Sequence, residues 1–232
     1  MPPTEAQHRT WTQLWELLEP RLQAHACREY LAGRQALGYT AARIPDLDRL
    51  DARIQAATGW RLVLTSERHL DPEGWYRRFA QREFLLTDHV RAAEELEYAP
   101  EPDLLHDLIG HVPYLLDPRY TAVEELFAPA FLRADQAGRE AVKQLAWYST
   151  EFGLLRQDGA LKVLGAGLIS SAGEIDRVAA GEVPVQEFRY QDVLARPRSV
   201  WEFNRVLFVA DSLEAYRQEL ERAFAALGIG GD

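Results

Sequence analysis

Cysteine is almost absent from this chain, with Cys27 the single example among 232 residues. One thiol cannot form an intrachain disulfide, and it excludes zinc or iron-sulfur sites that need several cysteines. Any metal would therefore be held by histidine and carboxylate side chains. Such sparing use of cysteine is typical of a reducing compartment, so we expect a cytoplasmic protein.

The sequence also lacks long apolar runs and an excess of positive charge. No stretch approaches the ~20 apolar residues that span a bilayer, and the N-terminal MPPTEAQHRTWTQ lacks the charged and apolar blocks of a secretion signal. The formal net charge of -10 disfavours nucleic acid and anionic membranes, which attract clustered lysine and arginine. We expect small-molecule ligands, with no nucleic acid and no membrane as partners.

Linkers, repeats and low-complexity tracts are missing as well, so no domain boundary is indicated. Hydrophobic residues make up 47% of the chain, which is enough for a sizeable core. We predict a single catalytic domain over residues 1–232. Its fold class is mainly α with a small β component.

Apolar spacing gives the expected order of the elements. Trp11, Leu14 and Leu18 begin a helix that Pro20 should kink or break, and a second helix follows over 25–38, ended by Gly38. The other predicted helices cover a short segment after Pro45, then 71–84, 122–134, 138–155 and 213–227. The predicted strands cover 60–65, 161–164 and 206–209.

The most informative residues are two histidines in the segment EPDLLHDLIGHVP, His106 and His111. Asp103 is placed to cap the helix that carries His106. On an ideal α-helix, side chains five residues apart diverge by about 140°, so the two imidazoles can converge only if the helix stops between them. Gly110 and Pro113 are residues that end helices. We interpret the pair as metal ligands, and the alternative is a structural role for each histidine.

No histidine follows His111, so a third ligand from the downstream chain must be acidic. Glu151 is the best candidate because Trp147, Leu154 and Leu155 place it in an apolar helical stripe, where an unpaired charge would cost several kcal/mol. The alternative is a buried salt bridge with arginine or lysine. Two imidazoles and one carboxylate are the ligand set of a ferrous ion with positions open for oxygen and a reductant. The residues thus indicate an oxygen-using iron enzyme.

These residues belong to a series of motifs that closely resembles the catalytic domain of the pterin-dependent aromatic amino acid hydroxylases, the family of phenylalanine, tyrosine and tryptophan hydroxylases. The motifs follow one another over most of the chain. They are HACREYL at 25–31, IPDL at 44–47, TGWRL at 58–62, PEPDLLHDLIGHVP at 100–113, WYSTEFGL at 147–154, GAGLISSAGE at 165–174 and FVADS at 208–212.

The resemblance implies the aromatic amino acid hydroxylase catalytic-domain fold in its short bacterial form, acting as a monomer. It implies that iron(II), with O2 and tetrahydropterin as cosubstrates, hydroxylates the ring of an aromatic amino acid, most readily phenylalanine or tryptophan. The implied iron ligands and catalytic residues are His106, His111 and Glu151. The implied substrate-binding residues are Arg91, Asp103, Pro100, Trp147, Phe152, Gly167 and Ser170. The implied pterin-binding residues are Trp75 and Asp107.

Three departures from the family pattern lie near the expected cavity. Relatives usually carry a V-x-G-L-[LI] loop before the stacking aromatic residue, whereas this chain has LTSERHLDPEGW at 64–75. Ala146 stands where Tyr or Phe is usual, and Leu164 stands where Tyr is usual. The altered pterin loop suggests a second hypothesis, a diverged non-heme iron oxygenase of the same fold with another reductant or an amino-acid-derived substrate. A third hypothesis is a non-catalytic binding protein on the same scaffold.

Overall fold

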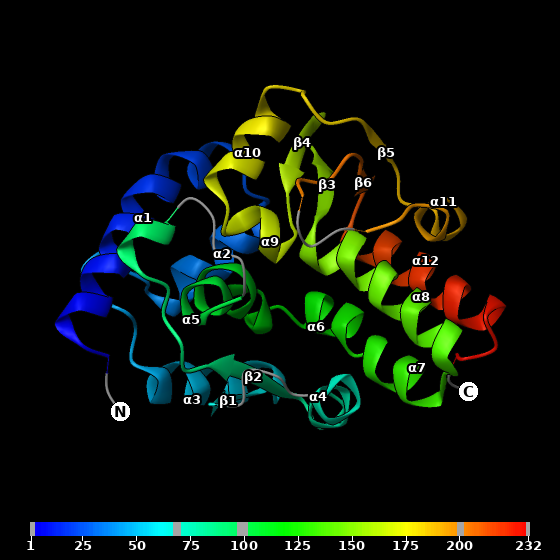
Figure 1. Ribbon diagram of the computed structural model, residues 1–232, viewed down its shortest axis with the longest axis horizontal. Helices are drawn as coiled ribbons and strands as arrows, with labels where there is room; N and C mark the ends of the chain where they lie inside the picture. Colours follow the sequence, from blue (N-terminus) through cyan, green and yellow to red (C-terminus); the bar gives the residue numbers. More distant parts are fainter. Residues whose placement is uncertain (1–2, 67–70, 97–101, 199–201, 231–232) are drawn as a thin grey trace.

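The structure is a computed structural model that describes residues 3–66, 71–96, 102–198 and 202–230. Helices dominate it (Figure 1). The α-helices are α1 Glu5–His25, α2 Arg28–Leu37, α3 Leu47–Thr58, α4 Pro72–Phe79, α5 Leu104–His106, α6 Pro118–Glu124, α7 Phe127–Arg133, α8 Gln136–Ala146, α9 Ala166–Ile169, α10 Ala172–Ala179, α11 Tyr190–Leu194 and α12 Leu213–Ala226. Two 3-10 helices, η1 Ala93–Glu95 and η3 Val112–Leu116, and two π-helical turns, η2 Asp107–His111 and η4 Trp147–Glu151, connect them.

The strands form two small sheets. The first pairs β1 Arg61–Thr65 with β2 Glu83–Thr87 in parallel. The second has the order β4-β3-β6-β5, with β4 Ala160–Val163 antiparallel to β3 Gly153–Gln157, and with β6 Leu207–Ala210 parallel to both β3 and β5 Val185–Glu187. Figure 1 shows the two sheets on opposite sides of the layer that contains α5 and α6. The prediction of a mainly helical fold with a small sheet is confirmed.

The helix runs on through Pro20 to His25, so the break expected there as one alternative to a kink does not occur. Leu18 and Leu22, on either side of the proline, are both buried in the core, and this packing outweighs the single hydrogen bond that proline removes. The chain leaves the helix at Ala26 with extended backbone, and the Cys27 N–H then donates to the carbonyl of Val163 at 3.0 Å.

Three other predicted helices have different bounds in the structure. The one expected over 71–84 ends at Phe79, and Phe84 lies in β2. The one expected over 122–134 is divided into α6 and α7. The one expected over 138–155 ends in the π-turn η4, so Leu154 and Leu155 lie on β3 and do not share a helical stripe with Glu151. The strands near 60–65, 161–164 and 206–209 are confirmed, as is the end of α2 at Gly38, which has φ of 70°.

One hydrophobic cluster extends from α1 to α12 and includes Trp11, Trp60, Tyr114 and Phe208. Both segments that carry the candidate metal ligands are anchored in it, through Leu105 and Ile109 on one side and Tyr148 on the other. None of the helices in the described ranges is long and apolar enough to cross a membrane.

Candidate metal centre

His106 and His111 lie on a helix that widens between them. Asp103 caps α5, its Oδ1 accepting the His106 N–H at 3.0 Å. The next turn, η2, is π-helical, with the Val112 N–H donating to the carbonyl of Asp107. Because i→i+5 bonding places residues five apart above one another, the two Nε2 atoms lie 3.2 Å apart. The expectation that the helix must stop for the imidazoles to converge was wrong, since a π-turn brings them together within a continuous helix.

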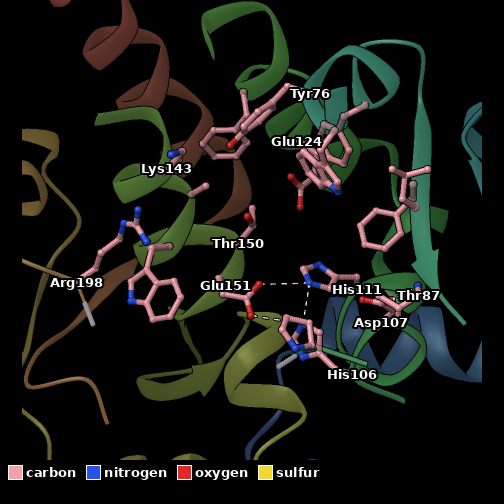
Figure 2. A pocket seen from close by; sticks show the side chains of 18 residues that line it. Tyr76, Thr87, His106, Asp107, His111, Glu124, Lys143, Thr150, Glu151 and Arg198 are labelled. Carbon is pink, nitrogen blue, oxygen red and sulfur yellow. Dashed lines mark hydrogen bonds and ion pairs between the residues drawn. The ribbon is translucent and has the colours of Figure 1, made fainter. Parts of the chain in front are cut away.

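Glu151 reaches the same point from a second π-turn. The Phe152 N–H donates to the carbonyl of Trp147 at 2.8 Å, again an i→i+5 bond. Glu151 Oε1 lies 3.5 Å from His106 Nε2, and Oε2 lies 3.3 Å from His111 Nε2. Figure 2 shows the three side chains pointing toward one another. One ligand atom from each residue lies within 4.8 Å of the others.

These spacings fit one shared cation. Ligand atoms about 2.1 Å from an ion and at right angles to one another lie roughly 3.0 Å apart, which is close to the three distances between donor atoms. Burial lowers the pKa of His106 to about 4, so its imidazole is neutral near pH 7 and offers a lone pair. Burial opposes ionisation of Glu151, but the two histidines bring its pKa below the usual value, so the carboxylate is charged. The donor set therefore suits a divalent metal ion.

Ser170 fixes the orientation of His106. Its hydroxyl donates to the carbonyl of Ala166 at 2.9 Å, so its oxygen accepts the hydrogen of His106 Nδ1 at 2.8 Å. This tautomer leaves Nε2 unprotonated and directed at the metal position. Within the described residues, Nδ1 of His111 is buried without a hydrogen-bond partner.

Two glycines allow the backbone to approach the metal centre closely. A Cβ on Gly167 would lie 2.5 Å from Phe152 Cζ and 2.9 Å from Glu151 Oε1. A Cβ on Gly110 would lie 2.8 Å from the carbonyl oxygen of Ala166. Gly110 therefore serves to bring η2 against α9, and its predicted role of ending a helix was wrong.

The three candidate ligands line a cavity of about 400 Å³. One group of lining residues comes from α4, β2, α6 and α7 and includes Trp75, Tyr76, Phe79, Phe84, Glu124 and Phe127. A second group comes from α8, η4 and the segment near 198 and includes Lys143, Ala146, Trp147, Thr150 and Arg198. The lining is mostly aromatic and apolar, with a few polar groups, as in small-molecule sites.

Arg91 and Asp103 form a buried ion pair beside the site. Arg91 Nη2 donates to Asp103 Oδ1 at 2.7 Å, and Nε donates to Oδ2 at 3.1 Å. Burial opposes the charge on Asp103, but the Arg91 guanidinium holds the pKa of this carboxyl below its usual value. The two hydrogen bonds hold the guanidinium in one plane, because Asp103 is itself fixed as the N-cap of α5.

The remaining residues predicted to contact the substrate are distributed around the centre. Trp147 lines the cavity, and its ring lies 4.4 Å from that of Phe152. Trp147 Nε1 donates to Asn204 Oδ1 at 2.9 Å, which fixes the indole. Pro100 lies outside the described residues.

Both residues predicted to contact the pterin line the cavity. Trp75 stacks on Phe79 with ring centroids 4.4 Å apart and planes inclined by 20°. Asp107 accepts the Thr87 N–H at 2.9 Å, and burial raises its pKa to about 7. Residues 67–70 of the departing loop lie outside the described part of the chain.

Sequence reasoning missed Glu124, a second carboxyl group in the cavity. Glu124 is only 6% exposed. Burial raises the pKa of its carboxyl group to about 7, and the charge of His111 acts in the opposite direction. The signal was present, because Tyr120, Val123 and Phe127 are spaced as one buried helical face that also includes position 124.

Comparisons with known proteins agree with this geometry. The family model described as biopterin-dependent aromatic amino acid hydroxylase matches residues 2–228. Phenylalanine-4-hydroxylase of Ralstonia nicotianae is 32% identical, over 97% of this chain and 74% of that protein. Phenylalanine-4-hydroxylase of Caulobacter vibrioides is also 32% identical, over 97% of this chain and 76% of that protein.

Solved structures give the same result. Chromobacterium violaceum phenylalanine hydroxylase, with bound iron(III) and 7,8-dihydrobiopterin, superposes with a TM-score of 0.90 at 28% identity, covering 97% of this chain and 82% of that one. Phenylalanine hydroxylase of Legionella pneumophila gives a TM-score of 0.91 at 27% identity, covering 99% of this chain and 93% of that one. The chain belongs to the biopterin-dependent aromatic amino acid hydroxylases.

Proposed function

We propose that this protein hydroxylates the ring of phenylalanine, with iron(II) held by His106, His111 and Glu151 and with a tetrahydropterin as cosubstrate. The observation that carries the proposal is the convergence of two imidazole nitrogens and one carboxylate at a single point of the cavity. The sequence analysis left phenylalanine and tryptophan as candidate substrates. Phenylalanine is supported because the relatives are named phenylalanine-4-hydroxylases.

The side chains of this protein hold and shield the reactants. Iron(II), when bound, would supply the activation of O2, with the pterin as electron donor. Ser170 keeps His106 in the tautomer that offers Nε2 to the ion. The mostly aromatic and apolar lining offers few polar partners to water, and electrostatic interactions are stronger in such surroundings.

Arg91 is the proposed anchor of the substrate carboxylate. A guanidinium binds a carboxylate through two parallel hydrogen bonds, and the pair with Asp103 holds this guanidinium in one plane. The rings of Trp147 and Phe152 form the proposed surface for the substrate ring. Arg91→Ala should raise the KM for phenylalanine with little change in iron affinity.

The direct test is product analysis with iron(II), a tetrahydropterin, O2 and each aromatic amino acid in turn. We expect tyrosine from phenylalanine, formed only when the pterin is present. Oxygen consumption that needs no pterin would support the diverged oxygenase instead. Failure to bind iron(II) at micromolar concentrations would indicate a non-catalytic binding protein.

A further inference from the structure

Glu124 is a buried carboxyl group that faces the cavity and is not one of the proposed iron ligands. It is the last residue of α6, it is 6% exposed, and it lines the cavity. Figure 2 shows it at the edge of the open space that His111 and Thr150 also face. A carboxyl group in such a position loses the hydration that would stabilise its charge.

In the part of the chain that the structure describes, Glu124 forms no ion pair, although His111 acts against the rise in its pKa. No lysine, arginine or histidine nitrogen there lies within the 4.0 Å of an ion pair. The cations of the cavity, Lys143 and Arg198, pair with Glu140 at 2.7 and 3.2 Å. The neighbouring Glu125, in contrast, has Arg82 at 3.0 Å and accepts the Trp60 indole N–H at 3.2 Å.

A buried carboxyl group without a cation is costly to the fold, and a bound ligand that supplies N–H donors would offset this cost. Glu124 lines the cavity together with two aromatic rings of α4, Trp75 and Phe79, and its charge acts on Tyr76, which also lies on α4. A ligand that lies against these rings and is rich in ring N–H and amino groups matches this surface. A reduced pterin has this chemistry.

We propose that Glu124 binds the reduced pterin, its carboxyl oxygens accepting hydrogen bonds from the amino and ring N–H groups of the cosubstrate. This inference rests on the proposed function, since it assumes that a tetrahydropterin enters the cavity. It makes Glu124 a determinant of cosubstrate affinity that is separate from the iron ligands and from Arg91.

The test is a fluorescence titration of the iron(II)-loaded protein with tetrahydrobiopterin in the absence of oxygen. Glu124→Gln keeps the shape but loses the charge, Glu124→Leu loses the acceptors as well, and Glu125→Gln is the matched control outside the cavity. We expect the Kd for the pterin to rise roughly tenfold to a hundredfold in the two Glu124 variants. The control should bind the pterin as the unmodified protein does.

Two further readouts separate binding from a structural role. The Kd values for iron(II) and phenylalanine should stay unchanged in the Glu124 variants. Their melting temperature without ligand should equal or exceed that of the unmodified protein, because an uncompensated buried charge has been removed. A residue needed only for packing would lower the melting temperature.

Pterin affinity that is unchanged in both Glu124 variants overturns the inference while leaving the proposed function intact. A rise in the Kd for phenylalanine alone also overturns it, since Glu124 would then bind the amino group of the substrate. If the unmodified protein itself binds no tetrahydrobiopterin, the proposed function fails together with the inference.

Discussion

At the scale of single residues, the charge of Glu151 is expected to determine how tightly the candidate metal centre binds iron(II). Glu151 supplies the only charged oxygen among the three proposed ligands, so Glu151→Gln should lower iron(II) affinity by more than about a hundredfold. The side chain keeps its volume, and helix content measured by circular dichroism should therefore hardly change. Normal iron(II) binding by a folded Glu151→Gln protein would remove this residue from the ligand set.

Ser170 acts through His106. Ser170→Ala removes the acceptor of the Nδ1 hydrogen, so the imidazole is no longer held in one orientation, and iron(II) affinity should fall about 10- to 100-fold. The adjacent Ser171→Ala is the control, because the Ser171 hydroxyl caps α10 by accepting the Glu174 N–H, whereas the partner of His106 Nδ1 is Ser170. That control should lose about 1 kcal/mol of stability and keep its iron(II) affinity. Equal iron(II) affinities in both variants would contradict the orienting role.

At the scale of elements, two π-helical turns bring the ligands together, and one of them depends on a close contact. Gly110→Ala would place a methyl group 2.8 Å from the Ala166 carbonyl oxygen, so η2 must move away from α9. We expect a loss of about 1 to 3 kcal/mol in the free energy of unfolding and weaker iron(II) binding. Gly173→Ala, whose methyl group would make an ordinary 3.5 Å contact with Phe203, should leave both unchanged or slightly improved. Similar behaviour of the two variants in urea unfolding would argue against the η2–α9 contact.

The elements also show what the sequence could and could not predict. Local signals were sufficient for Asp103 as a helix cap and for Gly38 as a helix end, because each acts on its own turn. The uninterrupted helix through Pro20 was missed because burial of Leu18 and Leu22 is a property of the whole core. The π-turns were missed for a related reason. No pattern of apolar spacing in the sequence predicts i→i+5 hydrogen bonds.

The candidate site was predicted only in part for the same physical reason. The residues that carry chemistry, His106, His111 and Glu151, are evident from their types and motifs. The cavity is made by elements far apart in the sequence, so the inclusion of Glu124 and Lys143 depends on how α6 and α8 pack. The expected monomer stays a prediction that size-exclusion chromatography can check.

At the scale of the whole molecule, buried carboxyl groups make stability depend on pH. Burial raises the pKa of Glu124 from 4.5 to about 7. Between these values the folded state keeps a proton that the unfolded state has released. Its contribution to stability is therefore complete below pH 4.5 and is lost as the pH rises through about 7.

Glu124→Gln should remove this dependence in the metal-free protein. We expect the difference in unfolding free energy between the variant and the unmodified protein to grow by about 3 kcal/mol in favour of the variant from pH 4.5 to 7. Asp107, with a pKa also raised to about 7, stays in both proteins, so its own titration cancels in the difference. Urea unfolding at several pH values measures it, and parallel stability curves would show that Glu124 does not titrate in this range.

We propose that His106, His111 and Glu151, brought together by two π-turns, hold the iron ion of a pterin-dependent phenylalanine hydroxylase. The most direct measurement is the amount of tyrosine formed by the iron(II)-loaded protein from phenylalanine, tetrahydrobiopterin and O2, compared with Glu151→Gln. We expect many turnovers per iron for the unmodified protein and almost none for the variant. No tyrosine from the iron-loaded, unmodified protein would contradict the account.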